Sequence, residues 1–306
     1  MSDRIDFAGR TVAVTGAGNG IGRAHALLLA ERGAHVVVND VGGSVAGGEG
    51  SGAVADAVVD EIVAAGGSAV ACTASVADED GGRQLVDVAL ETSGRLDAVI
   101  HNAGILRDRS FAKTEDGDVD PVLDVHLRGA FHVLRPAWPV MVEQGYGRVV
   151  LTTSASGLLG NFGQASYAAA KAGLVGLMNV LAIEGRRHGI QVNCLSPTAA
   201  TRMTEGLLGD LDARFDPRHV AAVAAYLASE RCELTHHILS AAGGRVARLF
   251  VGTAPGWYSG PEPASPDDIH AAIDAITSLE GWIVPDDGAG EVELIRAALL
   301  GESADA

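Results

Sequence analysis

Short apolar runs rich in β-branched residues alternate with longer stretches of helical spacing over the first two thirds of the chain. Such alternation is typical of βαβ units, in which helices cover parallel strands. The runs are apolar on both faces, as expected for a sheet buried on two sides. Strands are predicted at residues 11–15, 35–39, 68–72, 96–100, 148–153, 190–195 and 237–242. Helices are predicted near residues 20–32, 52–65, 78–93, 119–144, 165–188 and 217–229.

This pattern predicts one α/β domain, a doubly wound parallel sheet of the Rossmann type, over residues 1–244. Beyond it the alternation weakens. Residues 252–267 are rich in Gly, Pro and Ser, and a short helix is expected near 267–279. We expect residues 245–306 to be a C-terminal extension that covers or crosses the main domain, and not an independent domain.

Composition and charge exclude several function classes. No apolar run approaches the roughly 20 residues that span a bilayer, so no membrane partner is expected. A net charge of −17 disfavours binding to a nucleic-acid backbone. The cysteines Cys72, Cys194 and Cys232 have no metal-ligand spacing, so neither a metal nor a disulfide framework is predicted. With no secretion leader after Met1, the expected location is cytoplasmic.

A glycine-rich turn, "TGAGNGIG", follows the first predicted strand and carries Gly16, Gly20 and Gly22 just before a helix. Glycine lets the backbone approach a pyrophosphate, whose charge then lies at a helix N-terminus. Asp40 ends the next predicted strand. Its carboxylate can hydrogen-bond the adenine-side ribose and would repel a 2′-phosphate. The sequence therefore predicts a dinucleotide site that favours NAD over NADP.

A second glycine-rich run, "GGSVAGGEGSG", occupies residues 42–52. It contains Glu49 and no lysine, which argues against a second phosphate site. We expect a flexible loop at the edge of the sheet that can still close over the adenine end of the dinucleotide.

Tyr167 and Lys171 lie at i and i+4 in "QASYAAAK", hence on one face of a predicted helix. Without other motifs, a tyrosine and a lysine at this spacing would be ordinary residues on the exposed face of a helix. A nearby ammonium favours the phenolate of a tyrosine, whose ordinary pKa is about 10. The tyrosine can then take a proton from an alcohol or give one to a ketone. Ser154, at the end of a predicted strand in "TTSASG", can hydrogen-bond the same oxygen.

Together "TGAGNGIG", "HNAG", "TTSASG" and "SYAAAK" resemble the motifs of the classical short-chain dehydrogenase/reductase family over roughly residues 8–242. The resemblance implies an NAD-dependent oxidoreductase that interconverts a secondary alcohol and a ketone, working as a homodimer or homotetramer. It implies catalytic roles for Ser154, Tyr167 and Lys171. The cofactor-binding residues that it implies are Gly16, Asn19, Gly20, Ile21, Gly22, Asp40, Val76, Asn102, Ala103, Gly104, Tyr167, Lys171, Pro197 and Thr201.

A finer resemblance rests on "NAGILRDRSF", "VHLRGAF" and "SASGLLGNFGQASYAAAK". These stretches are similar to the (3R)-hydroxyacyl-CoA dehydrogenase units of peroxisomal multifunctional enzymes and their bacterial stand-alone relatives. The implied substrate is a 3-hydroxyacyl-CoA, with a hydroxysteroid or other lipid alcohol as the alternative. A catalytically silent dinucleotide-binding regulatory protein is the alternative of another class, and the intact Ser154, Tyr167 and Lys171 argue against it.

Some positions depart from the family pattern. His126 stands where the family often has an asparagine that relays protons through a bound water. It can either serve that relay or only pack within its helix. Pro197 is followed by a threonine instead of a glycine, and Thr204 rivals Thr201 for the nicotinamide amide. Residues 202–216 suit a mobile lid over an apolar substrate, which we favour, or a static surface helix.

Overall fold

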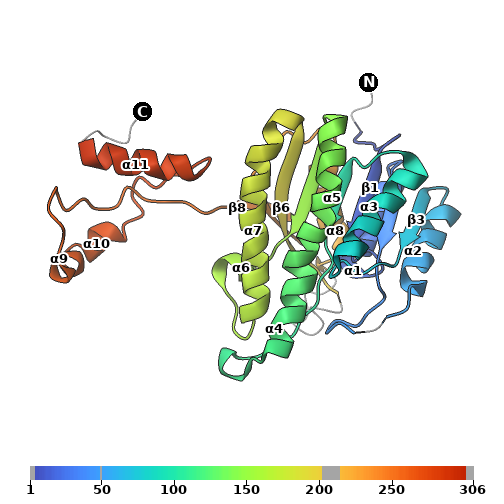
Figure 1. The fold of residues 1–306 in the computed structure, drawn as a ribbon, viewed down its shortest axis with the longest axis horizontal. Coiled ribbons are helices and arrows are strands. Elements are labelled where there is room, and N and C mark those ends of the chain that lie inside the picture. Colours follow the sequence, from blue (N-terminus) through green and yellow to red (C-terminus); the bar gives the residue numbers. More distant parts are fainter. Residues whose placement is uncertain (1–3, 49, 202–213, 301–306) are drawn as a thin grey trace. The chain divides into compact units, whose positions relative to one another are not determined.

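The structure is a computed structural model that describes residues 4–48, 50–201 and 214–300 (Figure 1). Eight strands form one sheet in the order β3-β2-β1-β4-β5-β6-β7-β8. The first seven pair in parallel, so their carboxyl ends meet at one edge. The strands are β1 Thr11–Thr15, β2 His35–Asn39, β3 Ser68–Cys72, β4 Ala98–His101, β5 Gly147–Thr152, β6 Ile190–Thr198, β7 Ile238–Ala242 and β8 Arg245–Leu249.

Helices cover both faces of the sheet. On one face α1 packs against α2 and α8, and on the other α3 packs against α5 and α4 against α7, which lie in front of the sheet in Figure 1. These helices are α1 Gly20–Glu31, α2 Ala53–Ala64, α3 Glu79–Ser93, α4 Asp116–Leu123, α5 Gly129–Gln144, α6 Ala155–Leu159, α7 Ala165–Gly185 and α8 Pro217–Ala228. The predicted doubly wound α/β fold is therefore confirmed.

The strands hold the core because their branched side chains alternate between two covered faces. Val12, Val14, Val36 and Val38 are fully buried. Burying one such side chain stabilises the fold by roughly 1.5–3 kcal/mol. One helical stretch, Ala165–His188, is long and apolar enough by composition to cross a membrane. It contains α7, which packs against α6, α4 and β6, as a core helix of a globular domain does.

Two departures from the predicted elements affect the site. The helix predicted over residues 119–144 is interrupted by a π-helical turn, Asp124–Arg128, between α4 and α5. The short helix α6 was not predicted, because five residues are too few to show a helical period. Both changes reposition side chains at the carboxyl-end edge of the sheet.

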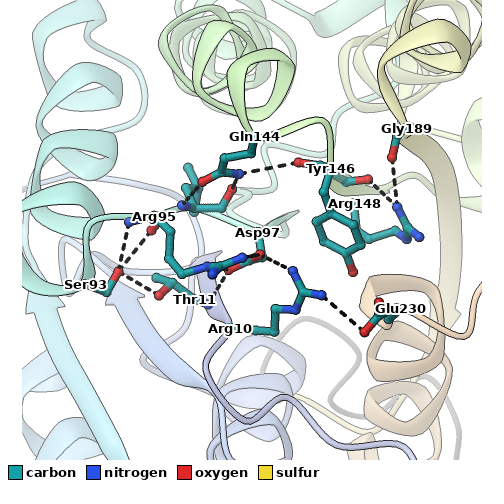
Figure 2. A network of polar contacts seen from close by, with 12 residues as sticks. Arg10, Thr11, Ser93, Arg95, Asp97, Gln144, Tyr146, Arg148, Gly189 and Glu230 are labelled. Carbon is teal, nitrogen blue, oxygen red and sulfur yellow. Dashed lines mark hydrogen bonds and ion pairs between the residues drawn. The ribbon is translucent and has the colours of Figure 1, made fainter.

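At the opposite edge, where the strands begin, a polar network surrounds Asp97 (Figure 2). The carboxylate is 2% exposed. It accepts a bond from Arg10 at 2.9 Å and two from Arg95 at 2.6 and 2.7 Å. The guanidinium groups of Arg10 and Arg148 each lie 4.3 Å from the ring centroid of Tyr146. The network joins the starts of β1, β4 and β5, far along the strands from the carboxyl-end edge.

The chain divides into two compact units, Met1–Arg248 and Leu249–Ala306. The second unit contains a stacked pair, Phe250 and Trp282, with ring centroids 4.8 Å apart. Its helices are α9 Pro266–Ala271, α10 Ile273–Ile276 and α11 Gly288–Leu300. The helix expected near 267–279 is thus two short ones, and α11 was not predicted. That these residues are an extension and not an independent domain stays a prediction.

Candidate active site

A cavity of about 380 Å³ lies at the carboxyl-end edge, beside β1 and β4, where the strand order reverses. Ligands bind at this point in doubly wound sheets. Of the predicted cofactor residues, Gly22, Tyr167, Lys171 and Pro197 do not line it. Pro197 instead lies within β6, paired with Ala241. The other ten do line it: Gly16, Asn19, Gly20, Ile21, Asp40, Val76, Asn102, Ala103, Gly104 and Thr201.

The glycine turn before α1 has no room for side chains. A Cβ on Gly16 would lie 2.8 Å from the Cα of Ala103, and one on Gly22 would lie 2.0 Å from the carbonyl oxygen of Gly16. The turn therefore packs backbone against backbone, and α1 begins directly after it at Gly20. A helix N-terminus opening on a cavity suits a pyrophosphate. The residues present thus fit a dinucleotide.

Asp40 follows β2 in the cavity wall. Its Oδ2 accepts a hydrogen bond from the backbone N–H of Gly18 at 2.8 Å. Its Oδ1 accepts one from the N–H of Gly42 at 2.7 Å. The carboxylate therefore joins the glycine turn to the second glycine-rich run while facing the cavity.

Ser154, Tyr167 and Lys171 come together where β5 leads into α6 and α7. Ser154 caps α6, and its Oγ accepts a hydrogen bond from the N–H of Ser156 at 3.1 Å. The Nζ of Lys171 lies 5.5 Å from the centroid of the Tyr167 ring. The hydroxyl of Thr153 donates to the Lys171 carbonyl at 2.8 Å and so ties α7 to the end of β5.

Burial dominates the electrostatics of this group. Burial raises the pKa of Tyr167, and a hydrogen bond with Ser154 opposes that shift. Burial lowers the pKa of Lys171 to about 7. Its Nζ donates to the carbonyl of Thr152 at 2.5 Å. The sequence led us to expect a lowered tyrosine pKa, whereas in the protein alone burial raises the pKa of Tyr167 more than the hydrogen bond with Ser154 lowers it.

His126 lies in the π-helical turn and is 2% exposed. Its ring meets the Tyr167 ring edge-on, with centroids 5.2 Å apart. Nε2 lies 3.0 Å from the backbone nitrogen and 2.8 Å from the carbonyl oxygen of Ile105. Nδ1 is buried and has no hydrogen-bond partner among the described residues. The carbonyl of His126 accepts a bond from Nε2 of His101 at 3.0 Å.

Several cavity residues lie outside the predicted set of cofactor-binding residues. The second glycine-rich run supplies five of them: Gly43, Ser44, Val45, Gly47 and Gly48. That this run covers the adenine end stays a prediction. The remainder end or follow β2, follow β3 and β4, or belong to α4 and the π-helical turn: Asn39, Val41, Ser75, Ala77, Ile105, Arg107, Pro121, Asp124 and Val125. The expected lid over 202–216 and Thr204 fall mostly or wholly outside the described residues.

Comparison with known proteins agrees with this geometry. The family model for short chain dehydrogenases matches residues 10–210. Peroxisomal multifunctional enzyme type 2 of Mus musculus is 51% identical over 251 residues, which cover 81% of this chain and 34% of the mouse protein. Putative short-chain type dehydrogenase/reductase Rv0148 of Mycobacterium tuberculosis is 48% identical over 273 residues, which cover 89% of this chain and 95% of that protein.

A solved structure is similar as well. Full-length peroxisomal multifunctional enzyme type 2 from Drosophila melanogaster superposes with a TM-score of 0.83 at 38% identity, covering 97% of this chain and 50% of that one. The chain thus spans only a third to a half of the multifunctional relatives' length. The matched segment contains the glycine turn, Ser154, Tyr167 and Lys171. The chain therefore belongs to the short-chain dehydrogenase/reductase family, and is an oxidoreductase that acts on an alcohol or ketone with a nicotinamide dinucleotide.

Proposed function

We propose that this protein interconverts a 3-hydroxyacyl-CoA and a 3-ketoacyl-CoA with NAD. The observation that carries the reaction type is the group of half-buried Ser154 and Tyr167 with buried Lys171 at the edge of the sheet where the dinucleotide cavity lies. The substrate class is supported by the name of a Mycobacterium tuberculosis relative, hydroxyacyl-CoA dehydrogenase ChsB1, which is 40% identical over 246 residues.

The choice of NAD is supported by Asp40. Its carboxylate is fixed by the N–H groups of Gly18 and Gly42 in the cavity wall. A fixed negative charge there repels a 2′-phosphate, and the ribose hydroxyls of NAD can donate to it. The ratio of kcat/KM with NAD to that with NADP measures this preference. A wild-type protein that prefers NADP would contradict the assignment.

Tyr167 moves the proton in this mechanism. When bound, the nicotinamide accepts or donates the hydride, and its oxidised form carries a positive charge that favours the phenolate. Tyr167 takes the proton of the alcohol in oxidation and returns one to the ketone oxygen in reduction. Ser154 hydrogen-bonds the same oxygen, and its bond to Tyr167 already opposes the effect of burial on the tyrosine pKa. The Nζ of Lys171 lies 5.5 Å from the centroid of the ring, and its protonated form, present below its lowered pKa of about 7, favours the phenolate.

His126 is the proposed next member of the proton path. Its ring contacts Tyr167, and its buried Nδ1 is a polar atom without a partner among the described residues. Its carbonyl already accepts a bond from His101, which leaves the ring as the more available polar group. A His126→Phe variant keeps an aromatic ring beside Tyr167 and lacks both ring nitrogens, the unpartnered Nδ1 and the Nε2 that contacts the backbone of Ile105. If the ring relays protons, kcat falls while the dinucleotide KM stays unchanged, whereas an unchanged kcat shows that the ring only packs.

The main test uses Tyr167→Phe. Wild-type protein with NAD and a (3R)-hydroxyacyl-CoA should produce NADH, measured by its absorbance. The variant should lose a factor of roughly 10² to 10⁴ in kcat. It should bind NADH nearly like the wild type, because the change removes one hydroxyl and leaves the residues that line the cavity in place. Surviving turnover in the variant would show that another group is the acid and base.

A panel of hydroxysteroids and lipid alcohols tests the alternative substrate class. Turnover of these compounds without turnover of any 3-hydroxyacyl-CoA would replace the substrate and leave the reaction type standing. The cytoplasmic location and the homodimer or homotetramer stay predictions. Sedimentation of the purified protein measures the assembly, and fractionation of the source cells measures the location.

A further inference from the structure

Residues 42–48, called the strap below, form one wall of the dinucleotide cavity. The strap folds into a tight turn, in which the N–H of Gly47 donates to the carbonyl of Ser44 at 3.0 Å. The hydroxyl of Ser44 donates back to the carbonyl of Gly47 at 2.7 Å. Gly47 and Gly48 have φ angles of 88° and 104°, which residues with side chains rarely adopt. The glycines thus allow this shape, and hydrogen bonds maintain it.

The tip of the strap is bonded to the segment that follows β4. The carbonyl of Val45 accepts from the N–H of Leu106 at 2.9 Å. The carbonyl of Ala46 accepts from Nε of Arg107 at 3.0 Å. The Arg107 guanidinium also donates to the carbonyl of Gly117 in the first turn of α4. One side chain therefore bridges the strap and α4, two elements that both line the cavity.

We propose that Arg107 is a positioning residue that holds the strap closed over a bound dinucleotide and thereby slows dinucleotide release. This inference rests on the proposed function, because it requires the dinucleotide to occupy this cavity. The strap is rich in glycine and has few apolar side chains to pack, so its opening depends on the hydrogen bonds at its tip. Loss of the two bonds from Arg107 should shift the equilibrium between the closed and the open strap toward the open form by roughly tenfold.

A direct bond to a phosphate is the other use for an arginine in this cavity. The observed orientation favours the strap, since Nε and Nη1 both donate to backbone carbonyls. Nη2 also lies against the strap, 3.8 Å from where a Cβ on Gly47 would be. The two uses have different kinetic signatures. A charge that steers an anionic ligand speeds association, whereas a closed strap slows dissociation.

The test measures NADH association and release separately by stopped-flow fluorescence. Arg107→Met keeps the aliphatic stem and removes the donors. Arg109→Met is the matched control, because Arg109 is in the same segment and pairs with Asp118 at 3.0 Å. We expect roughly tenfold faster release from Arg107→Met, with little change in association. The control Arg109→Met should release NADH at the wild-type rate. Arg107→Lys retains a donor, so its release rate should lie between those of the wild type and Arg107→Met.

Two results would overturn the proposal: wild-type release from Arg107→Met, or slower association with unchanged release. Equal acceleration in Arg109→Met would also overturn it. Ser44→Ala provides an independent check, because it removes a bond inside the strap and leaves Arg107 in place. NADH release from Ser44→Ala should also be faster than from the wild type, by a smaller factor than from Arg107→Met. A wild-type protein that does not bind NADH would contradict the proposed function itself, so the two failures are distinguishable.

Discussion

Three histidines buried as neutral side chains predict a steep loss of stability in acid. His25 is 1% exposed, and neither ring nitrogen has a hydrogen-bond partner among the described residues. Burial lowers the pKa of His25 to about 3 and that of His101 to about 4. Burial also lowers the pKa of His126 well below its ordinary value. In the unfolded chain each titrates near pH 6.5.

The direction of the pH dependence follows from which state, folded or unfolded, binds more protons. Below about pH 6.5 the unfolded chain takes up a proton at each of these positions, and the folded chain does not. The free energy of unfolding therefore falls as pH falls through this window, and it is insensitive to these groups above it. Each histidine contributes about 1.4 kcal/mol per pH unit, so the three together contribute about 4 kcal/mol per unit. A typical stability of about 5–15 kcal/mol would be exhausted within a few units.

His25→Phe isolates one of these contributions without breaking a described hydrogen bond. Urea unfolding followed by circular dichroism at several pH values from about 5 to about 7.5, which span the histidine titration of the unfolded chain, gives the slope. Below about pH 6, the free energy of unfolding should fall less steeply with falling pH in the variant than in the wild type. The difference should be about 1.4 kcal/mol per pH unit. His219→Gln, an exposed position in α8, should keep the wild-type slope. A His25→Phe slope equal to that of the wild type would refute the reasoning.

Two further substitutions test the ends of the strands. Asp97→Ala should destabilise the fold by roughly 1–3 kcal/mol in urea unfolding, because it leaves the buried N–H of Thr11 unpaired and removes the carboxylate that binds the partly exposed guanidinium groups of Arg10 and Arg95. Burial raises the pKa of Asp97, but its bonds to Arg95, the β1 backbone and Arg10 outweigh burial and lower it, so this stabilisation is lost only in strong acid. Gly22→Ala, whose Cβ would overlap the Gly16 carbonyl, should abolish NADH binding measured by fluorescence titration.

The strand and helix framework could be predicted because its signals are local. The limits of β1, β2 and β3 agree with the predicted residues, since each is a short branched run between polar or glycine-rich segments. β4 begins later than predicted, at Ala98. The two preceding residues are held by the Gln144 side chain and by the arginines around Asp97. The contacts of Leu96 with Gln144 and of Asp97 with Arg10 join residues 48 and 87 positions apart, and no local pattern contains them.

Part of the candidate site could likewise be predicted from the sequence, and part could not. Ser154, Tyr167, Lys171 and the glycine turn could be identified because their chemistry requires particular residue types at fixed spacing. The π-helical turn could not, since it involves a bond from His101 to the carbonyl of His126 across two elements. The direction of the Tyr167 pKa could not be predicted either. It depends on how completely the folded chain removes water from the phenol, which sequence spacing does not contain.

In the proposed function, Asp40 would combine cofactor choice and closure of the strap in one side chain. The carboxylate that would exclude a 2′-phosphate also accepts bonds from Gly18 in the glycine turn and Gly42 at the base of the strap. Removing it would therefore relax selectivity and free both loops at once. A variant such as Asp40→Ala would then bind either dinucleotide weakly, whatever the charge alone had contributed. Cofactor preference is thus better measured on the wild type, and release on Arg107→Met, where each effect can change separately.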